Sequence, residues 1–177
     1  ALGAVDFLMW VVTGISTGLT QGFSIQLSQY YGAKDFENLR KSLAHSYRLT
    51  AFIADGVLIL SQSFASLVLT GLHTPSNIIG MSLLYLRIIF CGIPATAAYN
   101  MFASALRAMG NSKTPLTAMI IASVLNVSLD ILFVAGFGWG VAGAAIATVI
   151  AQSFSAVYCF LILRRIDIVH LTRADFM

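Results

Sequence analysis

The sequence predicts an all-α fold, a polytopic bundle of membrane-spanning helices. Three observations predict it: 58% of the 177 residues are apolar, only 10% are charged, and the mean hydropathy is +0.86. Soluble domains carry about 25% charged and about 45–50% apolar residues, so this chain has too few charges to cover a soluble surface. The same composition excludes a disordered chain, because a segment this apolar does not stay solvated.

Five apolar runs are long enough to cross a bilayer, whose hydrocarbon core of about 30 Å takes roughly 20 helical residues. We expect these spans at about residues 7–31, 49–70, 78–103, 115–136 and 141–163. Buried helices of a soluble protein are the alternative, but five such runs would leave no amphipathic helices to surround them. A juxtamembrane segment, residues 164–177, follows the fifth span.

The basic residues lie on one side of the predicted bundle. Nine of the ten are near the connections after spans one, three and five: Lys34, Arg40, Lys41, Arg48, Arg107, Lys113, Arg164, Arg165 and Arg173. Cytoplasmic loops carry such an excess. We therefore expect a multi-pass protein of the plasma (inner) membrane, with the chain start outside and residues 164–177 in the cytoplasm.

Several classes of partner are disfavoured by the composition. The net charge of +3 is too weak for nucleic-acid binding. The two cysteines and three histidines have no metal-ligand spacing, which predicts no zinc site and no disulfide framework.

The chain begins at Ala1, without an initiator Met or the basic start of a signal peptide, and an odd number of spans follows. We expect a fragment of a longer membrane protein whose surroundings are the lipid bilayer.

Small residues at intervals of four predict where the helices pack closely, because close backbone approach stabilises helix contacts in lipid. The two runs are Gly14, Gly18 and Gly22 in span one, and Gly143, Ala147, Ala151 and Ser155 in span five. The alternative is that such residues are merely common in membrane helices. In span three, Gly92 and Pro94 predict a bend near the midplane.

Four polar residues are predicted to meet in the outer half of the membrane. Asp130 lies within span four, with Asn126 one turn before it on the same helix face; an Asp at such a depth costs about 2.5–3.5 kcal/mol. At 1.5 Å per residue, Thr148 and Tyr85 lie within one helical turn of Asp130 in height. These oxygens suit a proton or a hard monovalent cation. The alternative is a polar cluster that only holds the helices together.

Arg87 and Asp55 are two further charged residues inside predicted spans. They lie on neighbouring spans at heights that differ by roughly 7–8 Å, a gap that a long arginine side chain covers. An unpaired charge at this depth is expensive. We therefore expect a structural ion pair here in preference to a role in transport.

Three stretches of the chain resemble a known transporter family. They are Gly18–Ser24 with Gln29–Asp35, Leu106–Pro115, and Asn126–Asp130 followed by Gly140–Thr148. Together they resemble the multidrug and toxic compound extrusion (MATE) transporters, in the DinF-like prokaryotic branch, over essentially the whole chain. The resemblance implies a twelve-helix protein with two six-helix lobes. This chain would be a partial amino-terminal lobe, helices two to six, without the first helix and the second lobe.

The resemblance also implies roles for the polar residues. In the DinF-like branch, the coupling proton or sodium ion binds at an Asn-x-x-x-Asp pair on helix five, which matches Asn126 and Asp130. A Tyr on helix four and a Thr on helix six match Tyr85 and Thr148, and a further Asp, on helix one, has no counterpart here. The implied function is a secondary antiporter, with no cofactor besides H+ or Na+, that exports small organic and often cationic compounds.

Two other functions stay open at this point. A flippase of a lipid-linked substrate would share the helical architecture, with a larger and more basic cavity and little dependence on Asp130. A non-transporting structural membrane protein would show no cation-dependent flux. An intramembrane enzyme is disfavoured, because the sequence contains no H-E-x-x-H motif and no intramembrane Asp pair obviously placed to share a proton.

Overall fold

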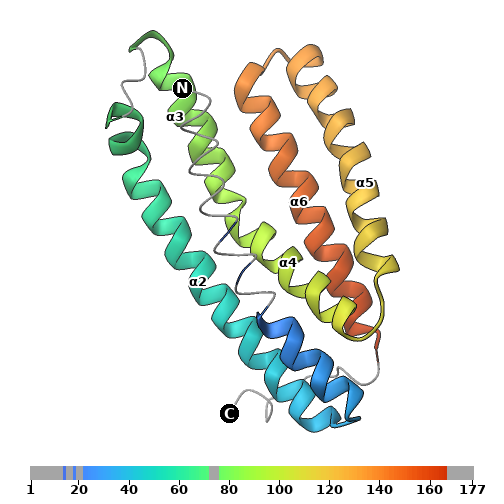
Figure 1. Cartoon of the computed structure of the whole chain (residues 1–177). Helices are drawn as coiled ribbons and strands as arrows, with labels where there is room; N and C mark the ends of the chain where they lie inside the picture. Colours follow the sequence, from blue (N-terminus) through green and yellow to red (C-terminus); the bar gives the residue numbers. More distant parts are fainter. Residues whose placement is uncertain (1–13, 15–17, 19–21, 72–75, 167–177) are drawn as a thin grey trace.

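A computed structural model describes residues 14, 18, 22–71 and 76–166 (Figure 1). This part of the chain is helical and contains no strand. A helical segment at residues 22–32 comes first. It is followed by α2 (Phe36–Gly71), α3 (Ser76–Cys91), α4 (Ile93–Ala108), α5 (Lys113–Asp130), the π-helix η1 (Ile131–Gly136) and α6 (Gly140–Arg164).

Four helical stretches in the described residues are long and apolar enough to cross a membrane. They are Phe36–Gly71, Ile78–Ala108, Lys113–Gly136 and Gly140–Arg164. The all-α class of membrane helix bundle is thereby confirmed. The first stretch begins well before residue 49, where the apolar run starts, because the helix continues through an amphipathic segment. Of the predicted span at residues 7–31, the greater part lies outside the described residues.

The predicted bend in the third span is confirmed. Helix α3 ends at Cys91 and α4 begins at Ile93, with Gly92 between them, and Figure 1 shows the two axes at an angle. Pro94 has no backbone N–H and cannot donate a helical hydrogen bond. The Gly92 N–H donates to the Ile89 carbonyl, three residues back, at 2.9 Å. The side chain of Gln62 on α2 donates to the Arg87 carbonyl at 2.9 Å. The break is therefore bonded to the neighbouring helix.

Helix α6 is the central element of the bundle. It packs against α3, α4, α5 and η1, while α2 covers the other side of α3 and α4. The small residues predicted to line its packing face are all buried: Gly143, Ala147, Ala151 and Ser155. For Gly14, Gly18 and Gly22 the expectation stays a prediction. All three are exposed, and no atom of the described part of the chain would lie within 4 Å of a Cβ at any of them.

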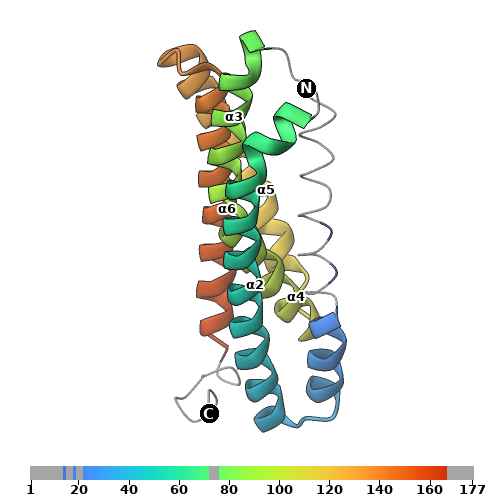
Figure 2. The same ribbon diagram turned by 90° about the vertical axis from the view of Figure 1, so that its left-hand side faces the viewer.

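The connections with basic residues lie at one end of the bundle. Residues 22–32 lie beside the start of α2 in both views (Figures 1 and 2), and Leu27 packs there in one buried cluster with Leu39 and Leu43. The turn between α4 and α5 and the end of α6 are at the same end. The basic residues of the described connections are thus gathered at one end of the folded chain, as predicted.

Two of these helix ends, those after residues 22–32 and after α4, are closed by a Schellman motif, in which a residue with positive φ ends the helix. After residues 22–32, Lys34 takes this position with φ 58°, and the Asp35 N–H donates to the Tyr30 carbonyl at 3.0 Å. After α4, Gly110 takes it with φ 82°, and the Asn111 N–H donates to the Leu106 carbonyl at 2.9 Å. The stretch Leu106–Pro115 is therefore a helix stop that leads into α5.

Candidate functional site

A hydrogen bond joins α5 to α6 at the predicted polar cluster. The Asn126 amide Nδ2 donates to the Thr148 hydroxyl oxygen at 3.4 Å. That hydroxyl donates its own hydrogen to the Ala144 carbonyl at 3.0 Å, so its orientation is fixed by the turn before it. The structure thus brings together two of the four predicted residues, on adjacent helices.

Asp130 lies one turn beyond Asn126 and is half-buried. Its Oδ1 atom is shielded from solvent and has no hydrogen-bond partner within the described part of the chain. A buried carboxylate oxygen without a partner is costly. This oxygen is therefore suited to accept a proton or to bind a cation.

The backbone changes its helical form directly after Asp130. In η1 the Phe137 N–H donates to the Leu132 carbonyl, five residues back, at 2.9 Å. Such π-helical turns occur frequently at functional sites. The Phe133 and Trp139 rings stack with centroids 5.2 Å apart, at the end of the α5–α6 pair that lies opposite the basic end of the bundle.

Gly143 lets α6 approach this turn. A Cβ built on Gly143 would lie 2.9 Å from the Phe133 Cβ and 3.1 Å from the Trp139 Cβ, distances at which atoms must shift. Because Phe133 lies three residues after Asp130, this contact holds the turn that follows Asp130 against α6. Sequence reasoning identified Gly143 as a packing residue but not as a neighbour of the polar site.

Tyr85 lies on α3 and is half-buried. No hydrogen bond between Tyr85 and the other three polar residues occurs in the described residues. Helix α3 meets α6 near its end, where a Cβ on Gly92 would lie 2.9 Å from Val149. Tyr85 is seven residues earlier, about 10 Å further from the basic end of the bundle, which places it closer in height to Asp130 than to Thr148. Its place in the site stays a prediction.

The expected ion pair between Arg87 and Asp55 does not form in the described structure. Both side chains are exposed. The interaction that does join α2 to Arg87 involves its backbone carbonyl, which accepts from Gln62. The height difference alone did not reveal the direction of each side chain around its helix, and direction decides whether two charges meet.

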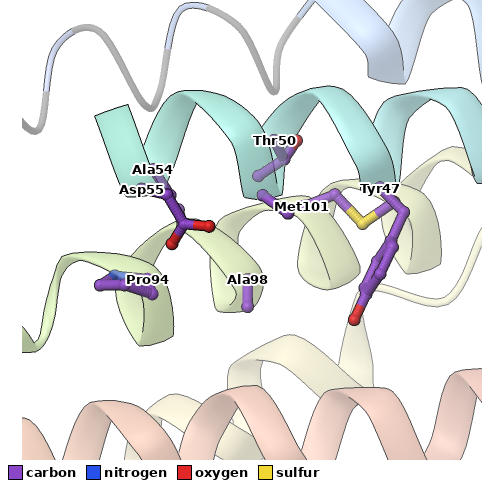
Figure 3. A pocket seen from close by; sticks show the side chains of 9 residues that line it. Tyr47, Thr50, Ala54, Asp55, Pro94, Ala98 and Met101 are labelled. Carbon is purple, nitrogen blue, oxygen red and sulfur yellow. The ribbon is translucent and has the colours of Figure 1, made fainter. Parts of the chain in front are cut away.

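Asp55 instead lines a cavity of about 240 Å³ between α2 and α4 (Figure 3). Its carboxylate points toward Pro94 and Ala98. The lining residues are Tyr47, Thr50, Ala51, Ala54, Asp55, Pro94, Ala97, Ala98 and Met101. Sequence reasoning missed this cavity, although the three- and four-residue spacing of its α2 members places them on one helix face.

Comparisons with known proteins identify the family. A sequence model of the MatE family matches residues 1–132. The chain is 32% identical over 160 residues to a probable multidrug resistance protein of Bacillus subtilis, YoeA, covering 88% of this chain and 34% of the relative. It is 33% identical over 161 residues to a second such protein of the same organism, YpnP, covering 89% and 36%.

The fold of the chain is also similar to that of solved structures of this family. The chain superposes with a TM-score of 0.88 and 26% identity on an outward-facing structure of a multidrug resistance MATE family transporter, covering 99% of this chain and 40% of that one. The chain belongs to the MatE family. It spans about a third of the length of the curated relatives that it matches.

Proposed function

We propose that this chain is part of a secondary antiporter that exports small organic compounds, and that Asp130 with Asn126 and Thr148 binds the coupling proton or sodium ion. The observation that carries the proposal is the shielded Oδ1 of Asp130, which has no partner within the described residues, one turn from a polar contact between α5 and α6. The family supports an export function, because its relatives here are named multidrug resistance proteins.

The site would work as a charge-neutralising switch. An empty site holds one carboxylate at membrane depth, which is unfavourable, and a proton or Na+ removes that charge. Neutralisation would change the packing of α5 on α6, since Gly143 already brings η1 against α6 at Phe133. We place Tyr85 at the outer side of the same site and the basic end of the bundle in the cytoplasm.

The ion gradient is large enough to drive export. One monovalent charge that moves through 100 mV releases about 2.3 kcal/mol. At 1.36 kcal/mol per factor of ten, this supports a roughly 50-fold gradient of the exported compound. A single coupling ion is therefore sufficient in energetic terms.

The test is dye efflux in everted vesicles that contain the full-length protein, with proton and sodium gradients imposed separately. We expect efflux of a cationic dye to require one of the two gradients and to be lost in the Asp130→Asn variant. Asp35→Asn is the matched control: it also removes one carboxylate, but from an exposed turn outside the spans, and should leave efflux unchanged.

Two results would contradict the proposal. Efflux that persists in Asp130→Asn would place the coupling site elsewhere. If no cationic dye moved under either gradient, a flippase of a lipid-linked substrate would become the better interpretation.

A further inference from the structure

We infer that a second cavity, between residues 22–32 and α2, binds the headgroup of an anionic phospholipid, with Lys41 and His45 on its phosphate. The cavity measures about 250 Å³ and lies at the basic end of the bundle. It contains none of the residues of the polar site on α5 and α6. Lipid binding there goes beyond the proposed function and does not depend on it.

The cavity is formed by one face of each of two packed helical segments. Its α2 residues recur at three- and four-residue spacing from Asn38 to Leu49, which places them on one side of that helix. The facing segment contributes residues at the same spacing. The Ser42 hydroxyl on α2 donates across to the Gln26 Oε1 atom at 3.2 Å. This hydrogen bond joins the two walls of the cavity.

The lining changes from polar to apolar along the cavity. Toward the turn between the two segments it includes Tyr30, Asn38 and Lys41, and at the far end it includes Phe23 and Leu49. Leu49 also begins the apolar run of residues 49–70. A phospholipid has the same order of groups, a charged headgroup followed by acyl chains. The cavity is therefore better matched to a lipid than to a free anion.

Lys41 and His45 lie at the height of lipid headgroups. Measured along α2 from Leu49, His45 lies about 6 Å and Lys41 about 12 Å nearer the basic end. The interfacial layer on each side of a bilayer is roughly 5–8 Å thick, and the long lysine side chain can reach back into it. Because the two residues are four apart on one helix, a phosphate group between them can contact both.

The side chains that line the cavity are mainly donors, and no described residue of the lining is a carboxylate. Lys41 supplies an ammonium group and His45 an imidazole N–H. The Gln26 amide oxygen accepts from Ser42, so its NH2 group is left as a further donor. Basic pockets between helices at a membrane surface bind anionic headgroups in this way.

Two carboxylates on the first turn of α2 compete with a ligand for these donors. Glu37 accepts from the Lys41 ammonium at 2.7 Å, and Asp35 accepts from the Asn38 amide at 2.6 Å. The side chains of Lys41 and Glu37 are 49% and 70% exposed, and ion pairs this exposed contribute little to stability. An ammonium group has three N–H donors, so a phosphate can bind beside Glu37 or in its place.

The experiment is native mass spectrometry of the purified full-length protein in detergent, titrated with phosphatidylglycerol or with phosphatidylcholine. We expect the wild type to bind the anionic lipid more tightly than the zwitterionic one. Lys41→Gln should weaken phosphatidylglycerol binding about fivefold, the effect of one basic residue beside anionic lipid, and His45→Gln should weaken it too. Lys113→Gln is the matched control: it removes an exposed lysine from the same end, outside the cavity.

Glu37→Gln separates lipid binding from a merely structural ion pair. It breaks the same pair as Lys41→Gln does but keeps the ammonium and removes a negative charge, so phosphatidylglycerol should bind equally or more tightly. A structural role of the pair would make both variants weaken binding alike. Excess inorganic phosphate should not displace the lipid, because it lacks the acyl chains that the apolar end receives.

Five results would overturn the proposal. They are equal binding of the two lipids, wild-type binding of phosphatidylglycerol by Lys41→Gln or His45→Gln, an equal loss in Lys113→Gln, a loss in Glu37→Gln, and displacement of the lipid by inorganic phosphate, which would make the cavity a site for free anions. All of these measurements are made without an ion gradient, so they stand or fall separately from efflux through Asp130.

Discussion

Gly92 and Val149 are in direct contact at the point where α3, α4 and α6 meet. A Cβ on Gly92 would lie 2.9 Å from the Val149 Cγ2 and 3.1 Å from the Ile89 carbonyl oxygen. The absence of a side chain at the helix break thus lets α6 approach the bend. This approach sets the height of Thr148, the neighbour of Val149, relative to α3.

We predict that Gly92→Ala lowers the thermal unfolding midpoint of the protein in detergent. The added methyl overpacks the contact, which typically costs about 1–3 kcal/mol. Adding Val149→Ala should restore part of the loss, because it removes the clashing atom. Gly56→Ala on α2 is the control: a Cβ there meets nothing within 4 Å, so stability should stay equal or rise. A Gly92→Ala variant as stable as the wild type would contradict the prediction.

Gly143→Ala should impair both stability and ion-coupled efflux. Its Cβ would lie 2.9 Å from the Phe133 Cβ and 3.2 Å from the Phe133 carbonyl carbon, and no rotamer change moves those atoms. Helix α6 and η1 must therefore separate, which displaces the turn that follows Asp130. Efflux rate and unfolding midpoint check this together, with Gly80→Ala as the open-space control. Normal efflux from a folded Gly143→Ala protein would disprove the link.

The contact between Asn126 and Thr148 predicts a hydroxyl-specific effect. Thr148→Val removes the oxygen that accepts from the Asn126 amide, while Thr148→Ser keeps it. A neutral hydrogen bond contributes about 0.5–1.5 kcal/mol, so Thr148→Val should weaken the apparent affinity for the coupling ion by up to about tenfold. Thr148→Ser should bind the ion normally. Efflux measured against ion concentration checks this, and equal affinities in both variants would refute it.

Asp35 predicts a pH dependence at the basic end of the bundle. It caps α2, since its side-chain oxygens accept from the Asn38 amide at 2.6 Å and the Asn38 backbone N–H at 3.2 Å, and these bonds lower the pKa of the exposed Asp35 carboxyl. A lowered folded-state pKa means that the cap stabilises the helix above the unfolded pKa, about 3.9. This contribution is lost as the pH falls through the lower, folded-state value.

The Asn38 amide resonance, followed by NMR against pH, checks this prediction. We expect a transition midpoint below that of an unperturbed aspartate. In Asp35→Asn the transition should disappear while the cap is retained, because asparagine is also a good N-cap residue. A midpoint at or above the ordinary aspartate value would contradict the assignment of the cap.

Much of the site could be anticipated from local spacing. Asn126 and Asp130 are four residues apart on one helix, so they share a face whatever surrounds them. Thr148 was matched to them by height, and its hydrogen bond to Asn126 agrees with that match. The pairing of Arg87 with Asp55 failed under the same reasoning, because height says nothing about which way a side chain points around its helix.

The sequence by itself determined the apolar helices, the basic end, the break at Gly92 and the packing face of α6, because hydropathy, proline chemistry and small-residue spacing are local properties. Only the tertiary structure decided that Gly143 meets Phe133 and that Asp55 lines a cavity between α2 and α4. The physical reason is that lipid gives apolar helices no solvent-driven preference for one another. Partner choice therefore depends on the fit of surfaces that are far apart in the chain.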